Sequence, residues 1–226
     1  MSDLIGFADL GAINAVLFDL DGTLMDSESL TDCAIKHLLQ EQQIDAELDL
    51  VEFHGINWQS VSERLVQHFP ALAQLDVSNW LEEHCAQLIQ RQAPALIPGS
   101  VQAFLGASAQ MPVAIVTGSN AATVEAYLER AELQNACSFY ISNEQYRHSK
   151  PDPECYRQAA EQLNLSPETC LVFEDSIAGL HAAAAAGMPT IAIAHSAGVP
   201  PISLAPYCIS DYTSLPDDFF HRLHQT

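Results

Sequence analysis

Asn14-Ala-Val-Leu-Phe-Asp-Leu-Asp-Gly-Thr-Leu24 is the stretch around which the rest of the chain can be interpreted. Its apolar run, Ala15 to Phe18, predicts a short buried strand that ends where the polar residues begin. Asp19 and Asp21 follow one residue apart, so an extended backbone directs both carboxylates to the same side, and Gly22 allows a sharp turn after them. Two carboxylates at the end of a buried strand predict a site for a hard cation or a nucleophile, although an ordinary acidic turn is the simpler alternative.

The charge of the chain is strongly one-sided. Eight basic residues stand against 29 acidic ones, which gives a formal net charge of -21. Such a charge repels nucleic acids and anionic lipid surfaces. We therefore expect neither as a partner, and solubility is the simplest explanation of the acidity.

The cysteines and the N-terminal residues indicate the compartment. The six cysteines form no C-x-x-C pair and no zinc-finger spacing, so we expect free thiols in a reducing environment. The first ten residues contain no Lys or Arg and lack the basic region of a secretory signal. No apolar run is long enough for a membrane span. These features predict a cytoplasmic protein.

The segment that follows the opening stretch has a helical pattern. Between residues 30 and 92, apolar residues recur at helical spacing, as in Ile35, Leu38 and Leu39. Ser27 is expected to cap the first helix, and Pro70 to end a later one. The pattern predicts an all-helical insertion over residues 26–94. Residues 1–25 and 95–226 would form the other domain.

The sequence pattern changes after Pro98, where short apolar runs alternate with segments of helical spacing. Strands separated by helices of this length predict an α/β fold, a Rossmann-like parallel sheet covered by helices on both faces. The expected strands are 113–116, 139–141, 170–173 and 190–194, with an edge strand at 207–209. The expected helices are 101–108, 121–131, 153–163 and 176–186, with a closing helix near 217–223.

Three of the apolar runs end in residues that can carry chemistry. In a parallel sheet these ends meet at one edge, where open α/β folds bind their ligands. Lys150 lies in a loop before a helix that Pro151 is suited to start. The residues at the strand ends are Asp19, then Thr117, Gly118 and Ser119, then Glu174 and Asp175. Thr117 could also be an ordinary strand end, and Lys150 a solvated charge beside a helix.

Asp19, Asp21, Thr117, Lys150 and Asp175, in this order, resemble the four motifs of the haloacid dehalogenase superfamily of phosphotransferases. The resemblance covers nearly the whole chain, because the helical block falls where that superfamily inserts a small helical cap. It implies a Mg²⁺-dependent phosphatase that acts on a small phosphorylated metabolite through an aspartyl-phosphate intermediate.

The resemblance also implies a role for each residue. Asp19 would be the nucleophile, and Asp21 the general acid and then the general base. Mg²⁺ would be held by Asp19, the backbone carbonyl of Asp21 and Asp175, with Glu174 binding directly or through water. Phosphate would be bound by Thr117, Gly118, Ser119 and Lys150.

Other activities of the superfamily fit the residues less well. Dehalogenases lack an acid at the position of Asp21. β-Phosphoglucomutases usually carry a histidine where Thr31 stands and an arginine in the cap loop, where this chain has Trp58. We expect a phosphatase, with a phosphosugar mutase as the alternative. A phosphoacceptor receiver domain uses a similar residue set, but it is about half as long and has no helical insertion.

The substrate is the least determined feature. The cap would cover the site and contact the leaving group, so Asn57 and Trp58, which interrupt the helical block, are candidates for specificity. The few basic residues of the cap favour a monophosphorylated sugar over a nucleotide polyphosphate. We expect a monomer and leave a homodimer open.

Overall fold

The opening stretch forms the centre of a six-stranded sheet with the order β5-β4-β1-β6-β7-β8. The computed structural model describes residues 10–194 and 205–223, and every neighbouring pair in this sheet is parallel. The strands are β1 (Ala15–Phe18), β4 (Val113–Val116), β5 (Phe139–Ile141), β6 (Cys170–Glu174), β7 (Thr190–Ile193) and β8 (Tyr207–Ile209). The predicted Rossmann-like fold is confirmed.

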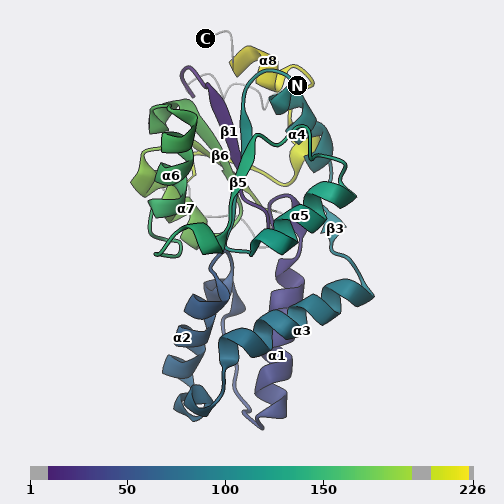
Figure 1. Ribbon diagram of the computed structural model, residues 1–226, viewed down its shortest axis with the longest axis vertical. Coiled ribbons are helices and arrows are strands. Elements are labelled where there is room, and N and C mark those ends of the chain that lie inside the picture. Colours follow the sequence, from purple (N-terminus) through teal and green to yellow (C-terminus); the bar gives the residue numbers. More distant parts are fainter. Residues whose placement is uncertain (1–9, 195–204, 224–226) are drawn as a thin grey trace.

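Helices cover both faces of the sheet, as Figure 1 shows. Val16 and Phe18 of β1 face a core shared with α4 (Ser100–Ser108), α5 (Ala121–Arg130) and α8 (Phe219–Leu223). Ala15 and Leu17 face the opposite core, which α6 (Glu154–Leu163) and α7 (Ile177–Ala186) complete. This alternation is why β1 is apolar at every position. Among the described residues, no helix combines the length and apolar character needed to cross a membrane.

The helical block lies below the sheet in Figure 1 and has its own apolar core. Its helices are α1 (Glu28–Glu41), α2 (Trp58–His68) and α3 (Val77–Arg91), with the 3-10 turns η2 (Leu50–Phe53) and η3 (Pro70–Gln74). Two connections join it to the sheet, through the antiparallel pair β2 (Met25–Asp26) and β3 (Ala95–Leu96). The sequence did not predict this pair, because two residues are too few to show a periodic pattern.

One local prediction was confirmed in position only, and one was wrong. Ser27 occupies the N-cap position of α1, but it makes no capping bond, because its hydroxyl donates to Asp21 Oδ1 at 2.6 Å. Pro151 does not start α6, which begins at Glu154, where the backbone N–H donates to Asp152 Oδ1. The remaining 3-10 turns are η4 (Asn143–Gln145), η5 (Pro167–Thr169) and η6 (Tyr212–Ser214).

The Phe18 ring anchors β1 to its neighbours. It is fully buried and stacks on Phe104 of α4 at 5.2 Å and on Phe173 of β6 at 5.0 Å between ring centroids. Because Asp19 is the next residue, this packing also fixes where the strand ends.

Phe18→Ala is expected to lower the free energy of unfolding by about 3–5 kcal/mol, since it removes a large ring from a closed core. Urea unfolding followed by circular dichroism measures the change. Leu105→Ala in α4, the helix that carries Phe104, is the control, because Leu105 is 46% exposed. That variant should change stability by less than about 0.5 kcal/mol. Equal effects of the two substitutions would contradict this account of the core.

Candidate active site

The ends of β1, β4 and β6 lie side by side and bring the predicted residues together. Lys150, which enters from the loop before α6, is 1% exposed. Its Nζ donates to Asp19 Oδ1 at 2.6 Å, to Glu174 Oε1 at 2.6 Å and to the Val116 carbonyl at 3.3 Å. Lys150 is therefore not a solvated charge beside a helix. It is the cation of a buried site.

Asp21 is held by hydroxyl groups. Ser119 Oγ and Thr117 Oγ1 donate to Asp21 Oδ2 at 2.6 and 3.2 Å, and Ser27 Oγ donates to Oδ1. The Thr117 carbonyl accepts a bond from the Tyr146 hydroxyl at 3.0 Å, which fixes the backbone at the end of β4. The loop after β4 thus positions Asp21 as well as its own hydroxyls.

The two oxygens of Glu174 are fully engaged. Oε1 accepts from Lys150 and from the Tyr156 hydroxyl at 3.2 Å. Oε2 accepts from the Ser176 backbone N–H at 2.8 Å and from the Ser176 hydroxyl at 3.0 Å. A Cβ at Gly179 would lie 1.6 Å from Oε1, so α7 needs a glycine at this position. Glu174 is a buried hydrogen-bond hub that orients Lys150.

Two carboxylate oxygens are left for a cation. Asp19, Glu174 and Asp175 each offer an oxygen within 4.8 Å of the others. Among the residues that the structure describes, no donor reaches the buried Asp19 Oδ2 or Asp175 Oδ2. Buried polar atoms normally have partners, and an oxygen-only set suits Mg²⁺. The residues present therefore fit a hard divalent cation.

Gly22 keeps this space clear. It has a φ of +75°, which favours glycine, and an added Cβ would lie 2.0 Å from Asp175 Oδ2. Asp175 Oδ1 accepts a bond from the Thr23 hydroxyl at 3.1 Å, which leaves Oδ2 directed towards the turn. The turn after Asp21 thus has a steric requirement that the sequence pattern alone did not reveal.

Burial and crowding of negative charge raise the pKa of several groups. Burial raises the pKa of Asp175 well above its usual range, and the charges of Glu174 and Asp19 add to the shift. Burial likewise raises the pKa of Asp19, with the Lys150 charge opposing. Burial alone would lower the pKa of Lys150, but Asp19 and Glu174 raise it overall, so Lys150 is charged. The single positive charge of Lys150 cannot balance the three carboxyl groups of Asp19, Glu174 and Asp175 if all of them ionise.

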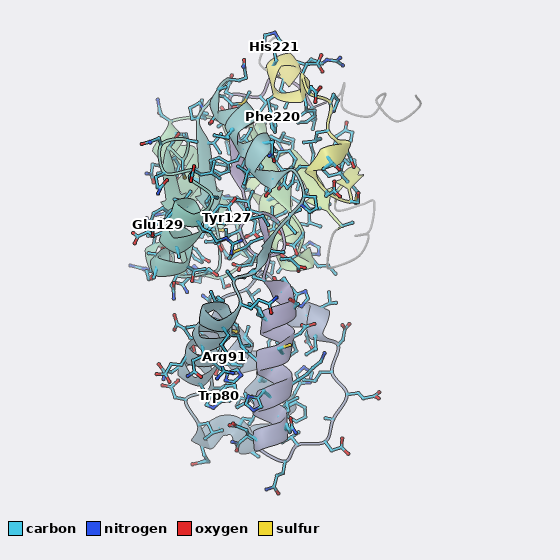
Figure 2. The ribbon with its side chains drawn as sticks, turned by 90° about the vertical axis from the view of Figure 1, so that its right-hand side faces the viewer. Trp80, Arg91, Tyr127, Glu129, Phe220 and His221 are labelled. Atoms are coloured by element: carbon cyan, nitrogen blue, oxygen red, sulfur yellow. The ribbon has the colours of Figure 1, made fainter. Side chains whose placement is uncertain are left out.

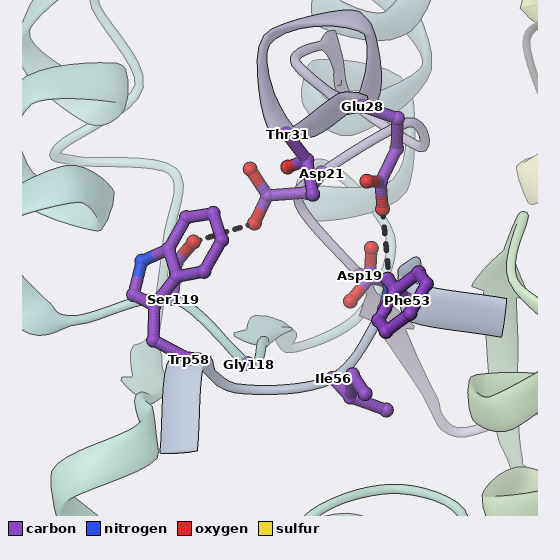
Figure 3. Close-up of a pocket in the computed structure, with 10 residues that line it drawn as sticks. Asp19, Asp21, Glu28, Thr31, Phe53, Ile56, Trp58, Gly118 and Ser119 are labelled. Atoms are coloured by element: carbon purple, nitrogen blue, oxygen red, sulfur yellow. Dashed lines mark hydrogen bonds between the residues drawn. The ribbon is translucent and has the colours of Figure 1, made fainter. Parts of the chain in front are cut away.

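The site opens into a small cavity of about 40 Å³ under the helical block. Figure 3 shows the side chains of Asp19, Asp21 and Glu28 directed into it. Glu28 was missed by the sequence analysis, although the run Asp26-Ser27-Glu28 placed a third acid near the turn. Glu28 is 3% exposed, and its Oε1 accepts the Gly55 backbone N–H at 3.0 Å. The lining residues are Asp19, Asp21, Glu28, Thr31, Phe53, Gly55, Ile56, Trp58, Gly118 and Ser119.

The loop between η2 and α2 closes this cavity against the sheet. A Cβ at Gly55 would lie 2.0 Å from Ser176 Oγ, and one at Gly118 would lie 3.1 Å from the Ile56 carbonyl carbon. The Asn57 backbone N–H donates to Ser149 Oγ at 3.2 Å. These close approaches hold the helical block over the ends of β1, β4 and β6.

The two candidate specificity residues differ in position. Trp58 lines the cavity, as expected. Asn57 does not, because its side chain accepts the Ser60 backbone N–H at 2.9 Å and caps α2. An asparagine directly before a helix favours this capping role over contact with a ligand.

Known proteins resemble the chain over most of its length. A family model described as haloacid dehalogenase-like hydrolase matches residues 13–187. Hexitol phosphatase A of Escherichia coli (strain K12) is 30% identical over 81% of this chain and 84% of its own. Fructose-1-phosphate phosphatase YqaB of the same organism is 27% identical over 78% of this chain and 94% of its own. The crystal structure of a β-phosphoglucomutase from Clostridium difficile matches with a TM-score of 0.76 at 20% identity, over 94% of this chain and 97% of that one, and supports the fold alone.

The crowded carboxyls predict an unusual pH dependence of stability without metal. Because the pKa of Asp175 is raised in the folded state, its favourable contribution is complete below the ordinary value of 3.8 and is lost as pH rises through the folded-state pKa. In EDTA, Asp175→Asn should therefore gain stability relative to the wild type between about pH 5 and pH 8. Thermal unfolding at each pH measures the difference. The exposed Asp218→Asn is the control, and parallel curves for Asp175→Asn and the wild type would contradict the prediction.

Proposed function

This chain belongs to the haloacid dehalogenase-like hydrolase family, and from that premise we propose that it is a Mg²⁺-dependent phosphatase acting on a small phosphorylated carbohydrate. The observation that carries the proposal is the meeting of Asp19, Asp21 and Lys150 at one edge of the sheet. The names of the two phosphatase relatives support a phosphorylated sugar or polyol as substrate. Residues 26–94 would act as the cap, and residues 1–25 and 95–226 as the core.

In the first step, an Asp19 carboxylate oxygen would attack phosphorus and form the aspartyl phosphate. The bond between phosphorus and the ester oxygen breaks, and the electron pair leaves with that oxygen. Lys150 holds Asp19 through a charge-assisted bond at 2.6 Å and would neutralise phosphate oxygens. The Gly118 backbone N–H would add a further donor, and the Thr117 hydroxyl and the Ser119 backbone N–H would join it by exchanging their present bonds to Asp21 and to Thr117 Oγ1 for bonds to phosphate. Asp21 would give its proton to the leaving oxygen.

In the second step, Asp21 would remove a proton from a water molecule that attacks the aspartyl phosphate. The phosphorus–Asp19 bond breaks, inorganic phosphate leaves, and Asp21 regains its proton for the next cycle. Asp21 lines the same cavity as Asp19, and the hydroxyls of Ser119 and Thr117 fix its carboxyl there. The same side chain can therefore serve as the acid and then as the base.

The metal would be held by Asp19, the backbone carbonyl of Asp21 and Asp175. The oxygens Asp19 Oδ2 and Asp175 Oδ2, which no described donor reaches, support this choice of metal ligands. Glu174 would bind through water, because its two oxygens already accept four hydrogen bonds. When bound, Mg²⁺ would supply positive charge that neutralises the phosphate as it is transferred.

The cavity lining favours hydrolysis over the mutase alternative. Thr31 and Trp58, which stand where β-phosphoglucomutases usually carry histidine and arginine, both line the cavity. No Lys or Arg is among the residues that line it in the described part of the chain. A mutase must bind a second phosphate on the sugar, and this lining has no basic side chain that would hold one there. An uncharged, hydroxyl-bearing leaving group suits this lining.

Replacing the nucleophile is the direct test. With Mg²⁺ and a panel of sugar and polyol monophosphates, the wild type should release inorganic phosphate, and Asp19→Asn should lower kcat by at least about 10³-fold. Asp218→Asn, in an exposed ion pair of α8, is the matched control and should keep full activity. Phosphate release measured with a colorimetric assay provides the rates. Normal turnover by Asp19→Asn would rule out the proposed nucleophile.

A second assay separates the two candidate activities. With β-glucose 1-phosphate, a sugar bisphosphate primer and Mg²⁺, a phosphatase produces inorganic phosphate, whereas a mutase accumulates the 6-phosphate isomer. We expect inorganic phosphate. Accumulation of the isomer would establish the mutase alternative, and chelation of Mg²⁺ with EDTA should stop either reaction.

A further inference from the structure

Two histidines meet on the helical block, away from the cavity. His37 of α1 and His84 of α3 approach so that His37 Nδ1 and His84 Nε2 are 3.0 Å apart. Their ring centroids are 4.5 Å apart with an interplanar angle of 44°. Trp80 stacks on His84 at 4.7 Å between ring centroids, and Figure 2 shows Trp80 in the helical part of the molecule, distant from the sheet.

The two nitrogens are within hydrogen-bond distance, and the ring positions also suit a shared ion. In a straight N–H···N bond of this length the ring centroids would be about 5.3 Å apart. Suppose instead that both nitrogens bound one metal ion, each at about 2.05 Å. A nitrogen–nitrogen separation of 3.0 Å would then give an N–metal–N angle of about 94° and a distance of about 4.7 Å between the two ring centroids. The observed 4.5 Å is closer to the second arrangement.

The surroundings keep metal-binding nitrogens available. His37 Nε2 lies 3.6 Å from Glu41 Oε1, a contact that favours the proton on Nε2 and directs the Nδ1 lone pair towards His84. Burial lowers the pKa of His84, and the neighbouring His37 lowers it further, so its neutral form predominates near neutral pH. Glu41 opposes this shift, and Arg91 adds to it. The His37 side chain is 43% exposed, which leaves a path from solvent.

We propose that His37 and His84 form a binding site for one divalent transition-metal ion, separate from the Mg²⁺ site. An angle near 90° between two imidazoles suits Cu²⁺ or Ni²⁺ in a tetragonal or octahedral arrangement better than tetrahedral Zn²⁺. Mg²⁺ prefers oxygen and would not compete. The bound ion joins α1 to α3 and stabilises the helical block.

The test uses untagged, metal-free protein in a large excess of MgCl₂, so that the acidic site is filled. NiCl₂ or CuCl₂ is titrated while calorimetry measures binding and Trp fluorescence reports quenching of Trp80. We expect one bound ion whose binding depends on both histidines, and a rise in the thermal unfolding temperature with added Ni²⁺. His37→Ala and His84→Gln should each weaken binding by at least about tenfold.

Matched variants make the outcome specific. His68→Ala removes a histidine of the same block that has a carboxylate partner, Glu52 at 3.2 Å, and should leave binding unchanged. Trp80→Phe should abolish most of the quenching and leave the calorimetric binding unchanged. Electron paramagnetic resonance of the Cu²⁺ complex should show two equatorial nitrogens. Binding that is equal in the wild type, His37→Ala and His84→Gln, with all three folded by circular dichroism, would overturn the proposal.

Discussion

The ion pair between the buried Lys150 ammonium and the carboxylates of Asp19 and Glu174 is the contact on which the site depends. It connects the ends of β1 and β6 with the loop before α6, so three separate stretches of the chain are fixed by one charge. Removing one partner of a buried pair costs about 3–5 kcal/mol, because the other charge is left without compensation. The same contact sets the chemistry. Asp19 and Asp175 keep oxygens that no described donor reaches, and a divalent ion can balance the excess negative charge there.

The helical block covers this charge. A cavity of about 40 Å³ is far smaller than the roughly 300–1,000 Å³ typical of small-molecule sites. A ligand that needs such a volume does not fit the cavity with the loop at residues 54–58 as it lies in this structure. Among the described residues, the polar contacts between the block and the core include Asn57 with Ser149, Asn120 with Glu82, and Ser27 with Asp21. The two short connections at β2 and β3 are paired with each other where the block joins the sheet.

The sequence predicted the sheet and the positions of its chemistry because both depend on short-range patterns. Apolar runs of four residues followed by Asp19, Thr117 or Glu174 mark a buried parallel strand and its end, and the structure brings these ends together. What the sequence could not show depends on contacts between distant residues. Ser27 bonds to Asp21 instead of capping α1, and buried Glu28 accepts a bond from Gly55, which lies 27 residues further along the chain. The capping role of Asn57 was readable locally, but the resemblance to a cap loop favoured a ligand contact.

The net charge of -21 explains why the cation of the site must be buried. A phosphate ester approaching this chain is repelled by the whole surface, and at physiological ionic strength that repulsion is screened beyond about 8 Å. Attraction must therefore act at short range, where the dielectric constant is low and a single charge has a large effect. Lys150 meets this condition because it is 1% exposed and its charge is kept by two carboxylates. A lysine on the surface would be outnumbered by the 29 acidic residues, whereas Lys150, buried against Asp19, acts only on a ligand that has reached Asp19.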